Sequence, residues 1–306
     1  MFGVNTSFVK VQPNNCLVPP QFVAHAKKIR DMEVYEDDVW MVSYPRTGSH
    51  WVQEMVWCIG NDCNYEKAKS LFLMRSPHLE ATPFMVTGRY VEFFAKMGDS
   101  VENISNMPRP RFIKSHLPLE LLPVQLQQKK PKIIYVARNA KDMCVSFYHY
   151  CQSFHDMTGS FDDFAELILK EHGPLGCYWK HVLTFWKIRD QENILFLTYE
   201  DMKKKQVEVI KRTAKFLGKT VTDDQISELG EHLKFSKMAE NSSVNMEFIL
   251  PEKCTQKDPN SKFIRKGKVG DWRNYMSDQL SKRFDEWTEK YLQGSDLKID
   301  SEVDIS

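Results

Sequence analysis

The segment Ser43–Trp51 reads SYPRTGSHW and carries groups that suit an anion. Gly48 allows the backbone to approach a ligand closely, the neighbouring hydroxyl and imidazole groups can donate hydrogen bonds, and Arg46 adds a permanent cation. Amide groups and the positive end of a helix dipole converge where a strand passes into a helix. The spacing of a Walker A loop is absent. Taken alone, the segment is either a phosphate loop or an ordinary strand–helix turn.

Lys114 and His116 lie two residues apart at the end of an apolar run, in FIKSHLPLELLP. Residues with this spacing on a strand point to the same side. A neutral imidazole can take a proton while an adjacent ammonium group steadies negative charge, so the pair suits general base catalysis. The alternative is a surface lysine beside a structural histidine.

Two further segments offer groups that bind phosphate. In IIYVARNAKDMCVSFYHY a strand ends at Arg138, and the helix that follows carries the hydroxyl of Ser146. In FIRKGKVGDWRN, Arg265 and Lys266 supply two cations and Gly267 a flexible backbone amide. The alternatives are an arginine that ends the sheet in solvent and an exposed basic loop.

The composition limits the class of protein. The 306 residues include 42 basic and 41 acidic ones, so binding of nucleic acid through bulk charge is not expected. No apolar run reaches the length of a membrane span, and the N-terminal segment lacks the apolar core of a signal peptide. The seven cysteines are scattered without a CxxC pair, which predicts reduced thiols, a cytoplasmic protein and no metal site.

Short apolar runs alternate with helical patterns along the chain. The runs that predict buried strands are Val39–Val42, Phe112–Ile113, Ile133–Ala137 and Ile194–Leu197. The segments that predict helices are 52–59, 161–169, 178–188 and 207–217, the last with Gly218 as its C-cap. This order predicts an α/β fold with a central, mainly parallel sheet and helices on both faces.

Two polar segments with poor periodicity, 83–110 and 241–262, are predicted to be long loops of the kind that bind ligands. No linker divides the chain. We therefore expect one domain over residues 1–306, with a core from about 17 to 295 and flexible tails.

Five of these stretches together resemble the cytosolic sulfotransferases. They are YPRTGSHW, KSHLPLELLP, YVARNAKDMCVSFYH, LTYEDM and RKGKVGDW, in the order and approximate spacing of that family. The resemblance runs from about Leu17 to the C-terminal helices. It implies a P-loop-like nucleotide-binding architecture and transfer of a sulfuryl group from 3′-phosphoadenosine-5′-phosphosulfate (PAPS), which leaves adenosine 3′,5′-bisphosphate (PAP). No metal is expected, because the transferred group carries less negative charge than a phosphoryl group.

The resemblance also assigns roles to residues of this chain. It implies His116 as the catalytic base, assisted by Lys114 and Arg46. It implies a 5′-phosphosulfate site at Arg46, Thr47, Gly48, Ser49 and His50, with Trp51 against the adenine. It implies a second phosphate site at Arg138, Ser146, Arg265, Lys266 and Gly267, with Tyr199 and Phe235 at the nucleoside. The acceptor pocket is expected at His78, Phe84 and Tyr150, joined by Met85 and Met246.

Three features depart from the family pattern. Arg46 stands where lysine is usual, and a guanidinium is a planar fork that does not give up a proton. Ser49 and His50 stand where two threonines are usual. The family's dimer signature falls on Arg273, Ser277-Asp278 and Lys282, with its final charge reversed, so a homodimer is possible but the usual interface is not expected.

The acceptor is expected to be a small lipophilic molecule with a hydroxyl, such as a phenol or a steroid-like alcohol, because aromatic and methionine linings suit flat apolar rings. The family often has phenylalanine at the position of His78, so a more polar acceptor is also conceivable. Two rival functions remain at this stage: a relative that binds the bisphosphate with weak or no turnover, and a small-molecule kinase. The kinase would need a Walker lysine and a metal-holding carboxylate, neither of which the sequence shows.

Overall fold

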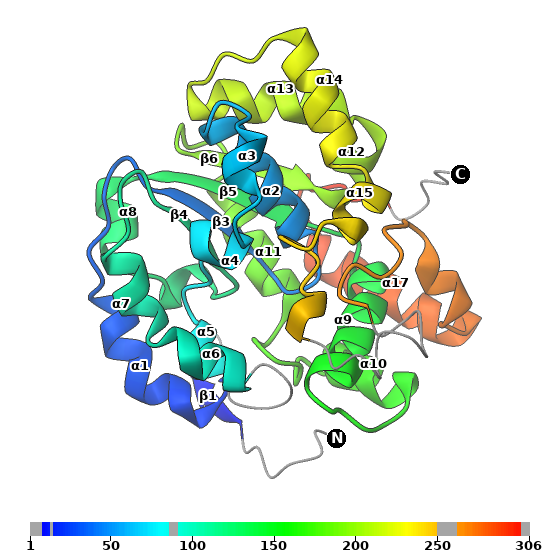
Figure 1. The fold of residues 1–306 in the computed structure, drawn as a ribbon. Coiled ribbons are helices and arrows are strands. Elements are labelled where there is room, and N and C mark those ends of the chain that lie inside the picture. The colour runs from blue at the N-terminus through cyan, green and yellow to red at the C-terminus, as the bar shows by residue number, and fades with distance from the viewer. Residues whose placement is uncertain (1–7, 13–14, 86–90, 250–261, 301–306) are drawn as a thin grey trace.

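A four-stranded parallel sheet with the order β4-β3-β5-β6 forms the centre of the molecule (Figure 1). The strands are β3 (Val39–Ser43), β4 (Phe112–Ser115), β5 (Lys132–Ala137) and β6 (Ile194–Thr198). The computed structural model describes residues 8–12, 15–85, 91–249 and 262–300. The four strands predicted from apolar runs are confirmed, and their ends differ from the prediction by one or two residues.

The order of the strands creates a reversal beside β3. From β3 the chain crosses to β4 on one side and then to β5 on the other. In open α/β sheets, ligands bind at such a reversal, outside the carboxyl ends of the strands. The turns that leave β3, β4 and β5 carry Gly48, His116 and Arg138, so the chain brings its chemical groups to one edge of the sheet.

Helices cover both faces of the sheet, as predicted. Alternate residues of β3 enter different apolar clusters: Trp40 and Val42 join one, and Val39 and Met41 join the other. The helices that contribute to the first cluster include α9 (Ala140–Phe154), α11 (Tyr178–Lys187) and α17 (Asp278–Leu292), and those of the second include α2 (Ser49–Gly60) and α13 (Gln206–Leu217). Burial on both sides explains why these strands read as continuous apolar runs rather than alternating ones.

The predicted helices are confirmed with small shifts at their ends. They correspond to α2, α10 (Phe161–Leu169), α11 and α13. Gly218 ends α13 in the left-handed conformation, with φ of 70°, which glycine adopts without steric cost. On α9, which begins after Arg138, the side chain of Asn139 caps the first turn by accepting from the amide of Asp142.

Further short elements surround this centre. They are β1 (Val9–Val11), β2 (Cys16–Val18), α1 (Pro20–Arg30), α3 (Tyr65–Ala68), α4 (Phe72–Arg75), α5 (Ala81–Phe84), η2 (Leu119–Leu121), α8 (Gln125–Lys129), α12 (Tyr199–Lys204), α14 (Asp223–His232), α15 (Phe235–Glu240), η3 (Glu247–Ile249) and η5 (Asp271–Asn274). Strands β1 and β2 pair in antiparallel fashion. Within the described ranges, none of the helices has the length and apolar character needed to cross a membrane.

The prediction of one long loop over 83–110 is wrong. The segment contains α6 (Val91–Met97) and α7 (Ser100–Ser105). Asp99 caps α7 by accepting from two amides of its first turn, and its carboxylate also pairs with Lys28 on α1. Helices of six or seven residues give too few turns for periodicity to be visible, and they persist here because caps and packing hold them. In the other predicted loop, 241–262, η3 is present and residues 250–261 lie outside the described ranges.

Candidate active site

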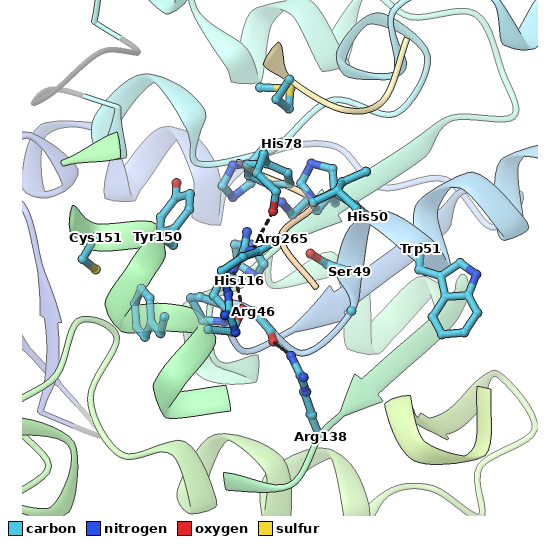
Figure 2. A pocket seen from close by; sticks show the side chains of 18 of the residues that line it. Arg46, Ser49, His50, Trp51, His78, His116, Arg138, Tyr150, Cys151 and Arg265 are labelled. Carbon is cyan, nitrogen blue, oxygen red and sulfur yellow. Dashed lines mark hydrogen bonds between the residues drawn. The ribbon is translucent and has the colours of Figure 1, made fainter. Parts of the chain in front are cut away.

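A pocket of about 250 Å³ opens at the carboxyl ends of β3, β4 and β5 (Figure 2). It brings together all the segments that the sequence singled out, although some of them lie more than two hundred residues apart. The predicted site residues in its lining are Arg46, Gly48, Ser49, His50, Trp51, His78, Phe84, Lys114, His116, Arg138, Ser146, Tyr150, Tyr199, Phe235, Arg265, Lys266 and Gly267.

Thr47 is the predicted site residue that does not line the pocket. It is fully buried, and its hydroxyl donates to the carbonyl oxygens of Tyr44 and Val136, at 2.8 and 3.0 Å. The second of these bonds ties the loop to β5. The side chain of Thr47 therefore supports the loop, and the predicted place of this residue at the nucleotide stays a prediction.

Gly48 is required by the shape of the first loop. It lies directly before α2 with φ of 105°, a conformation that side chains rarely allow. A Cβ atom here would also come within 2.8 Å of the Tyr199 ring. The turn thus presents the start of α2 to the pocket while Tyr199 packs directly against it.

The guanidinium of Arg46 links the first loop to the second predicted phosphate site. Its Nε donates to Ser146 Oγ at 3.2 Å, and Nη2 donates to the carbonyl of Phe263 at 2.9 Å. The group also lies over the rings of Tyr150 and Phe263, 5.1 and 4.7 Å from their centres. A lysine at this position could not make these planar contacts, so the departure from the family pattern has a structural use.

Arg138 crosses between the same segments. It donates to the carbonyls of Lys268 at 2.9 Å and Arg46 at 3.4 Å, and its guanidinium lies 4.3 Å from the centre of the Tyr199 ring. Trp51 also lies beside Tyr199, and their ring centres are 5.6 Å apart. Arg138 thus places a cation beside the neighbouring aromatic rings of Tyr199 and Trp51.

Arg265 and Lys266 are held by one carboxylate. Asp271, nearly buried, accepts from Arg265 Nη2 at 2.7 Å and from Lys266 Nζ at 2.9 Å. Gly267 follows with φ of 63°, and a Cβ atom there would come within 2.1 Å of the Phe235 ring. The two predicted nucleotide residues Gly267 and Phe235, from different segments, are therefore in direct contact.

His116 is oriented as a base. Its Nδ1 lies 2.8 Å from the carbonyl oxygen of Ser43, and because a carbonyl only accepts, Nδ1 carries the proton and Nε2 is the basic nitrogen. Burial, together with the neighbouring Lys114, holds the pKa of His116 well below its ordinary value, so the ring is neutral. Burial and Arg46 lower the pKa of Lys114 to about 7, although the carboxylate of Glu80 opposes the shift.

Glu80 is a buried residue that no sequence pattern marked. Its carboxylate accepts from the amide of His116, from the hydroxyl of Ser115 at 2.9 Å and from His78 Nε2 at 2.8 Å. Burial raises the pKa of Glu80, but its interaction with His78 and the hydrogen bonds from the His116 amide and the Ser115 hydroxyl outweigh burial and lower it. Glu80 therefore anchors the backbone that presents His116.

His50 has a different environment from the one a phosphate-binding hydroxyl would have. Its ring packs against Phe72 and Phe263, with centres 4.5 and 4.3 Å apart, and burial holds its pKa well below the ordinary value. Its Nε2 is buried without a hydrogen-bond partner in the described part of the chain. Its predicted role at the nucleotide stays a prediction.

His78, Phe84, Tyr150, Met85 and Met246, which the sequence suggests for the acceptor, also line the pocket. Their contact with an acceptor stays a prediction. Sequence reasoning missed further apolar residues of the lining, among them Phe8, Leu17, Phe94, Phe147 and Leu175. These come from five separate segments, and only the folded chain shows that they share a wall.

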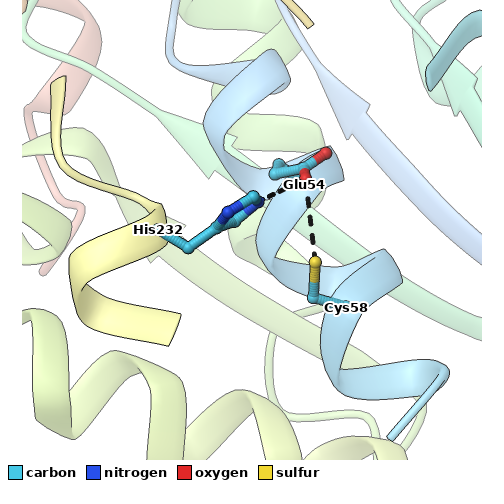
Figure 3. Close-up of side chains that lie close together, drawn as sticks. All are labelled: Glu54, Cys58 and His232. Carbon is cyan, nitrogen blue, oxygen red and sulfur yellow. Dashed lines mark hydrogen bonds and ion pairs between the residues drawn. The ribbon is translucent and has the colours of Figure 1, made fainter. Parts of the chain in front are cut away.

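A polar cluster on the far part of α2 supports this helix (Figure 3). Glu54 accepts from His232 Nε2 at 2.7 Å and pairs with Arg75 through its other oxygen at 2.5 Å, and Cys58 lies 3.7 Å from it. Burial raises the pKa of Cys58, which keeps the thiol protonated. His232 ends α14, three residues before Phe235 begins α15, so the cluster joins α2 to the end of α14.

The chain is similar to known sulfotransferases over most of its length. The sequence profile of the sulfotransferase domain matches residues 36–296. Luciferin sulfotransferase of Photinus pyralis is 36% identical, over 93% of this chain and 79% of that protein. Sulfotransferase 1E1 of Bos taurus is 33% identical, over 92% of each.

Solved structures show the same fold. A retinol dehydratase in complex with androsterone and the inactive cofactor PAP superposes with a TM-score of 0.85, at 31% identity, over 96% of this chain and 92% of the other. A mouse sulfotransferase complexed with PAP superposes with a TM-score of 0.74, at 28% identity, over 94% of this chain and 96% of the other.

Proposed function

The chain belongs to the sulfotransferase family, and from that premise we propose how its own residues carry out the transfer. The reaction is the transfer of a sulfuryl group from PAPS to an acceptor hydroxyl. The observation that carries the proposal is the convergence of three cationic segments on one pocket beside a neutral, buried imidazole.

Two groups of residues would hold the donor, one at each phosphate. The start of α2, with Gly48 and Ser49, would bind the 5′-phosphosulfate through backbone amides and the helix dipole. Arg138, Ser146 and Arg265 would bind the 3′-phosphate through charge-assisted hydrogen bonds.

The adenine would lie beside the aromatic surface made by Trp51 and Tyr199, since bases stack on aromatic rings. Two groups of phosphate-binding residues beside this surface would suit a nucleoside with phosphates on both sides of its ribose.

His116 would begin the chemical step. Its Nε2 takes the proton of the acceptor hydroxyl as the oxygen attacks sulfur in line, and its Nδ1–H bond to Ser43 keeps the ring in that tautomer. Lys114 and Arg46 would stabilise the charge that develops on the departing nucleotide. Loss of one such oriented donor costs about 10²–10³-fold in rate.

The acceptor would be a small lipophilic alcohol or phenol. The apolar end of the pocket supports this, since rings and methionines surround the space in front of His116. One structure of retinol dehydratase holds androsterone, and another structure of that enzyme holds retinol. A homodimer and a cytoplasmic location stay predictions, the latter resting on the scattered cysteines, of which those in the described ranges are unpaired.

The test uses a sulfur-labelled donor with a panel of phenols, steroids and aliphatic alcohols. We expect transfer by the wild-type chain, and loss of transfer in His116→Ala with PAP binding retained. Thermal shift with PAP and with ATP plus Mg²⁺ separates the rivals: stabilisation by PAP alone is expected, and stabilisation by ATP–Mg²⁺ alone would support a kinase. If the wild-type chain binds PAP but transfers nothing, the non-catalytic relative is the correct reading.

A further inference from the structure

We propose that His78 forms a second polar subsite in the acceptor pocket, and that the preferred acceptor carries a hydrogen-bond donor next to its reacting hydroxyl, as a catechol does. This inference rests on the proposed function, because it assigns the position of the acceptor relative to His116.

The backbone places His78 beside the catalytic strand. Residue 78 makes a parallel bridge with Lys114, the amide of Lys114 donates to the carbonyl of Pro77 at 2.9 Å, and the amide of Leu79 donates to the carbonyl of Lys114 at 2.8 Å. The segment around His78 thus pairs with β4 through one isolated parallel bridge, at the edge of the sheet. His78 is nearly buried, at 5% exposure, and lines the pocket above His116 in Figure 2.

The hydrogen bond to Glu80 fixes which nitrogen of His78 can bind a ligand. A carboxylate accepts, so His78 Nε2, 2.8 Å from Glu80 Oε1, carries the proton. Burial, with a contribution from the Lys114 charge, lowers the pKa of His78 even though Glu80 opposes the shift, so the ring is neutral. Its Nδ1 is then an acceptor, and no hydrogen bond to it exists among the residues described.

Two neutral imidazoles therefore present acceptor nitrogens in one pocket. The rings of His78 and His116 are 5.1 Å apart between centres and meet edge to face, at 80°. With the ring centres this close, hydroxyls on neighbouring carbons of one acceptor would each donate to one of the two rings, in hydrogen bonds of about 2.7–2.8 Å. His116 would take the proton of the reacting hydroxyl, while His78 Nδ1 accepts from the adjacent donor.

An acceptor with a single hydroxyl leaves His78 Nδ1 without a hydrogen-bond donor in a nearly buried position. Sites built to hydrogen-bond a substrate group discriminate against analogues that lack it, and one unpaired buried acceptor corresponds to about tenfold to hundredfold in kcat/KM. The alternative is that His78 only supports Glu80, and in that case its substitution would affect all acceptors alike.

The experiment measures kcat/KM with three matched acceptors: 4-ethylcatechol, 4-ethylphenol and 4-ethylguaiacol. The guaiacol keeps the second oxygen but has no donor on it. For the wild-type chain we expect the catechol to exceed the other two by at least tenfold, well above the factor of two that follows from its two hydroxyls.

Two variants test the residue. His78→Phe keeps a ring but removes both nitrogens, and it should lower the catechol value at least tenfold more than the phenol value. His78→Gln keeps an amide donor for Glu80 and a carbonyl acceptor for the ligand, and it should recover part of the preference. PAP-dependent thermal stabilisation of each variant reports whether its nucleotide site has folded.

The outcomes are distinct. If the wild-type chain sulfates the three acceptors within a factor of two or three, or if His78→Phe lowers all of them equally, the subsite is refuted and the proposed function stands. If the wild-type chain binds PAP but sulfates none of the panel, the proposed function fails and this inference fails with it.

Discussion

Replacing Lys114 by arginine should abolish a proton uptake that accompanies nucleotide binding. In the empty pocket the pKa of Lys114 is lowered to about 7 from its ordinary value of 10.5, mainly by burial. A bound nucleotide brings negative charge to the ammonium group and raises this pKa again. Affinity is therefore greatest below pH 7 and is lost as the pH rises above the pKa of the empty site.

The magnitude follows from this shift. If binding restores the ordinary pKa, the chain takes up about three quarters of a proton per PAP at pH 7.5 and about nine tenths at pH 8. The affinity should then fall about fifty-fold between pH 7 and pH 9. The phosphate groups of PAP, with a second pKa of about 6, are already about nine-tenths ionised at pH 7 and add little slope of their own.

Calorimetric titration with PAP in HEPES and in Tris measures the uptake, because the two buffers differ in ionisation enthalpy. Lys114→Arg keeps the charge at every pH and should bind with no uptake and little slope. Lys203→Met is the matched control, because Lys203 also lines the pocket and its pKa is also lowered by burial. The reasoning would be refuted if the pH dependence of PAP affinity vanished in Lys203→Met and persisted in Lys114→Arg.

Two further predictions concern the aromatic surface and the core. Trp51→Ala should weaken PAP binding by about 1–3 kcal/mol, because the base loses a stacking partner beside Tyr199, and Trp51→Phe should weaken it less. Calorimetry measures the affinity of both variants. Equal affinity for Trp51→Ala and the wild-type chain would contradict the placement of the adenine. Arg111→Met should lower the free energy of unfolding by about 3–5 kcal/mol, because it leaves the carboxylate of Asp38 buried and unpaired at 0% exposure. Arg109→Met, which breaks an exposed pair of the same type, should leave the urea midpoint unchanged, and similar losses for the two variants would show that burial is not the cause.

The sheet could be predicted because its strands are buried on both faces. Burial on two sides gives continuous apolar runs, and each run ends where the polar chemistry begins, as at Ser43 and Arg138. The position of the pocket also followed, since the carboxyl ends of parallel strands share one edge. Helices α6 and α7 could not be predicted, because six or seven residues held by caps and contacts leave no periodic trace.

The site was predictable in its cations and not in its hydrogen bonds. Arg46 and Ser146 were both expected near phosphate. The hydrogen bond from Arg46 to Ser146 could not be predicted, because it depends on the path of the loop. Thr47 was expected at the ligand because hydroxyls bind anions, yet it turns inward to two carbonyls. Glu80 carries no motif, and its role appears only when β4 lies beside it.

The central claim is that one pocket binds a single adenosine with phosphates on both sides of its ribose. The most direct test is the ratio of dissociation constants for adenosine 5′-monophosphate and PAP, measured by calorimetry at pH 7. The charge-assisted contacts of the second phosphate site predict that PAP binds at least about tenfold more tightly. Equal affinities would show that Arg138, Ser146 and Arg265 do not act on the 3′-phosphate, and would contradict the account.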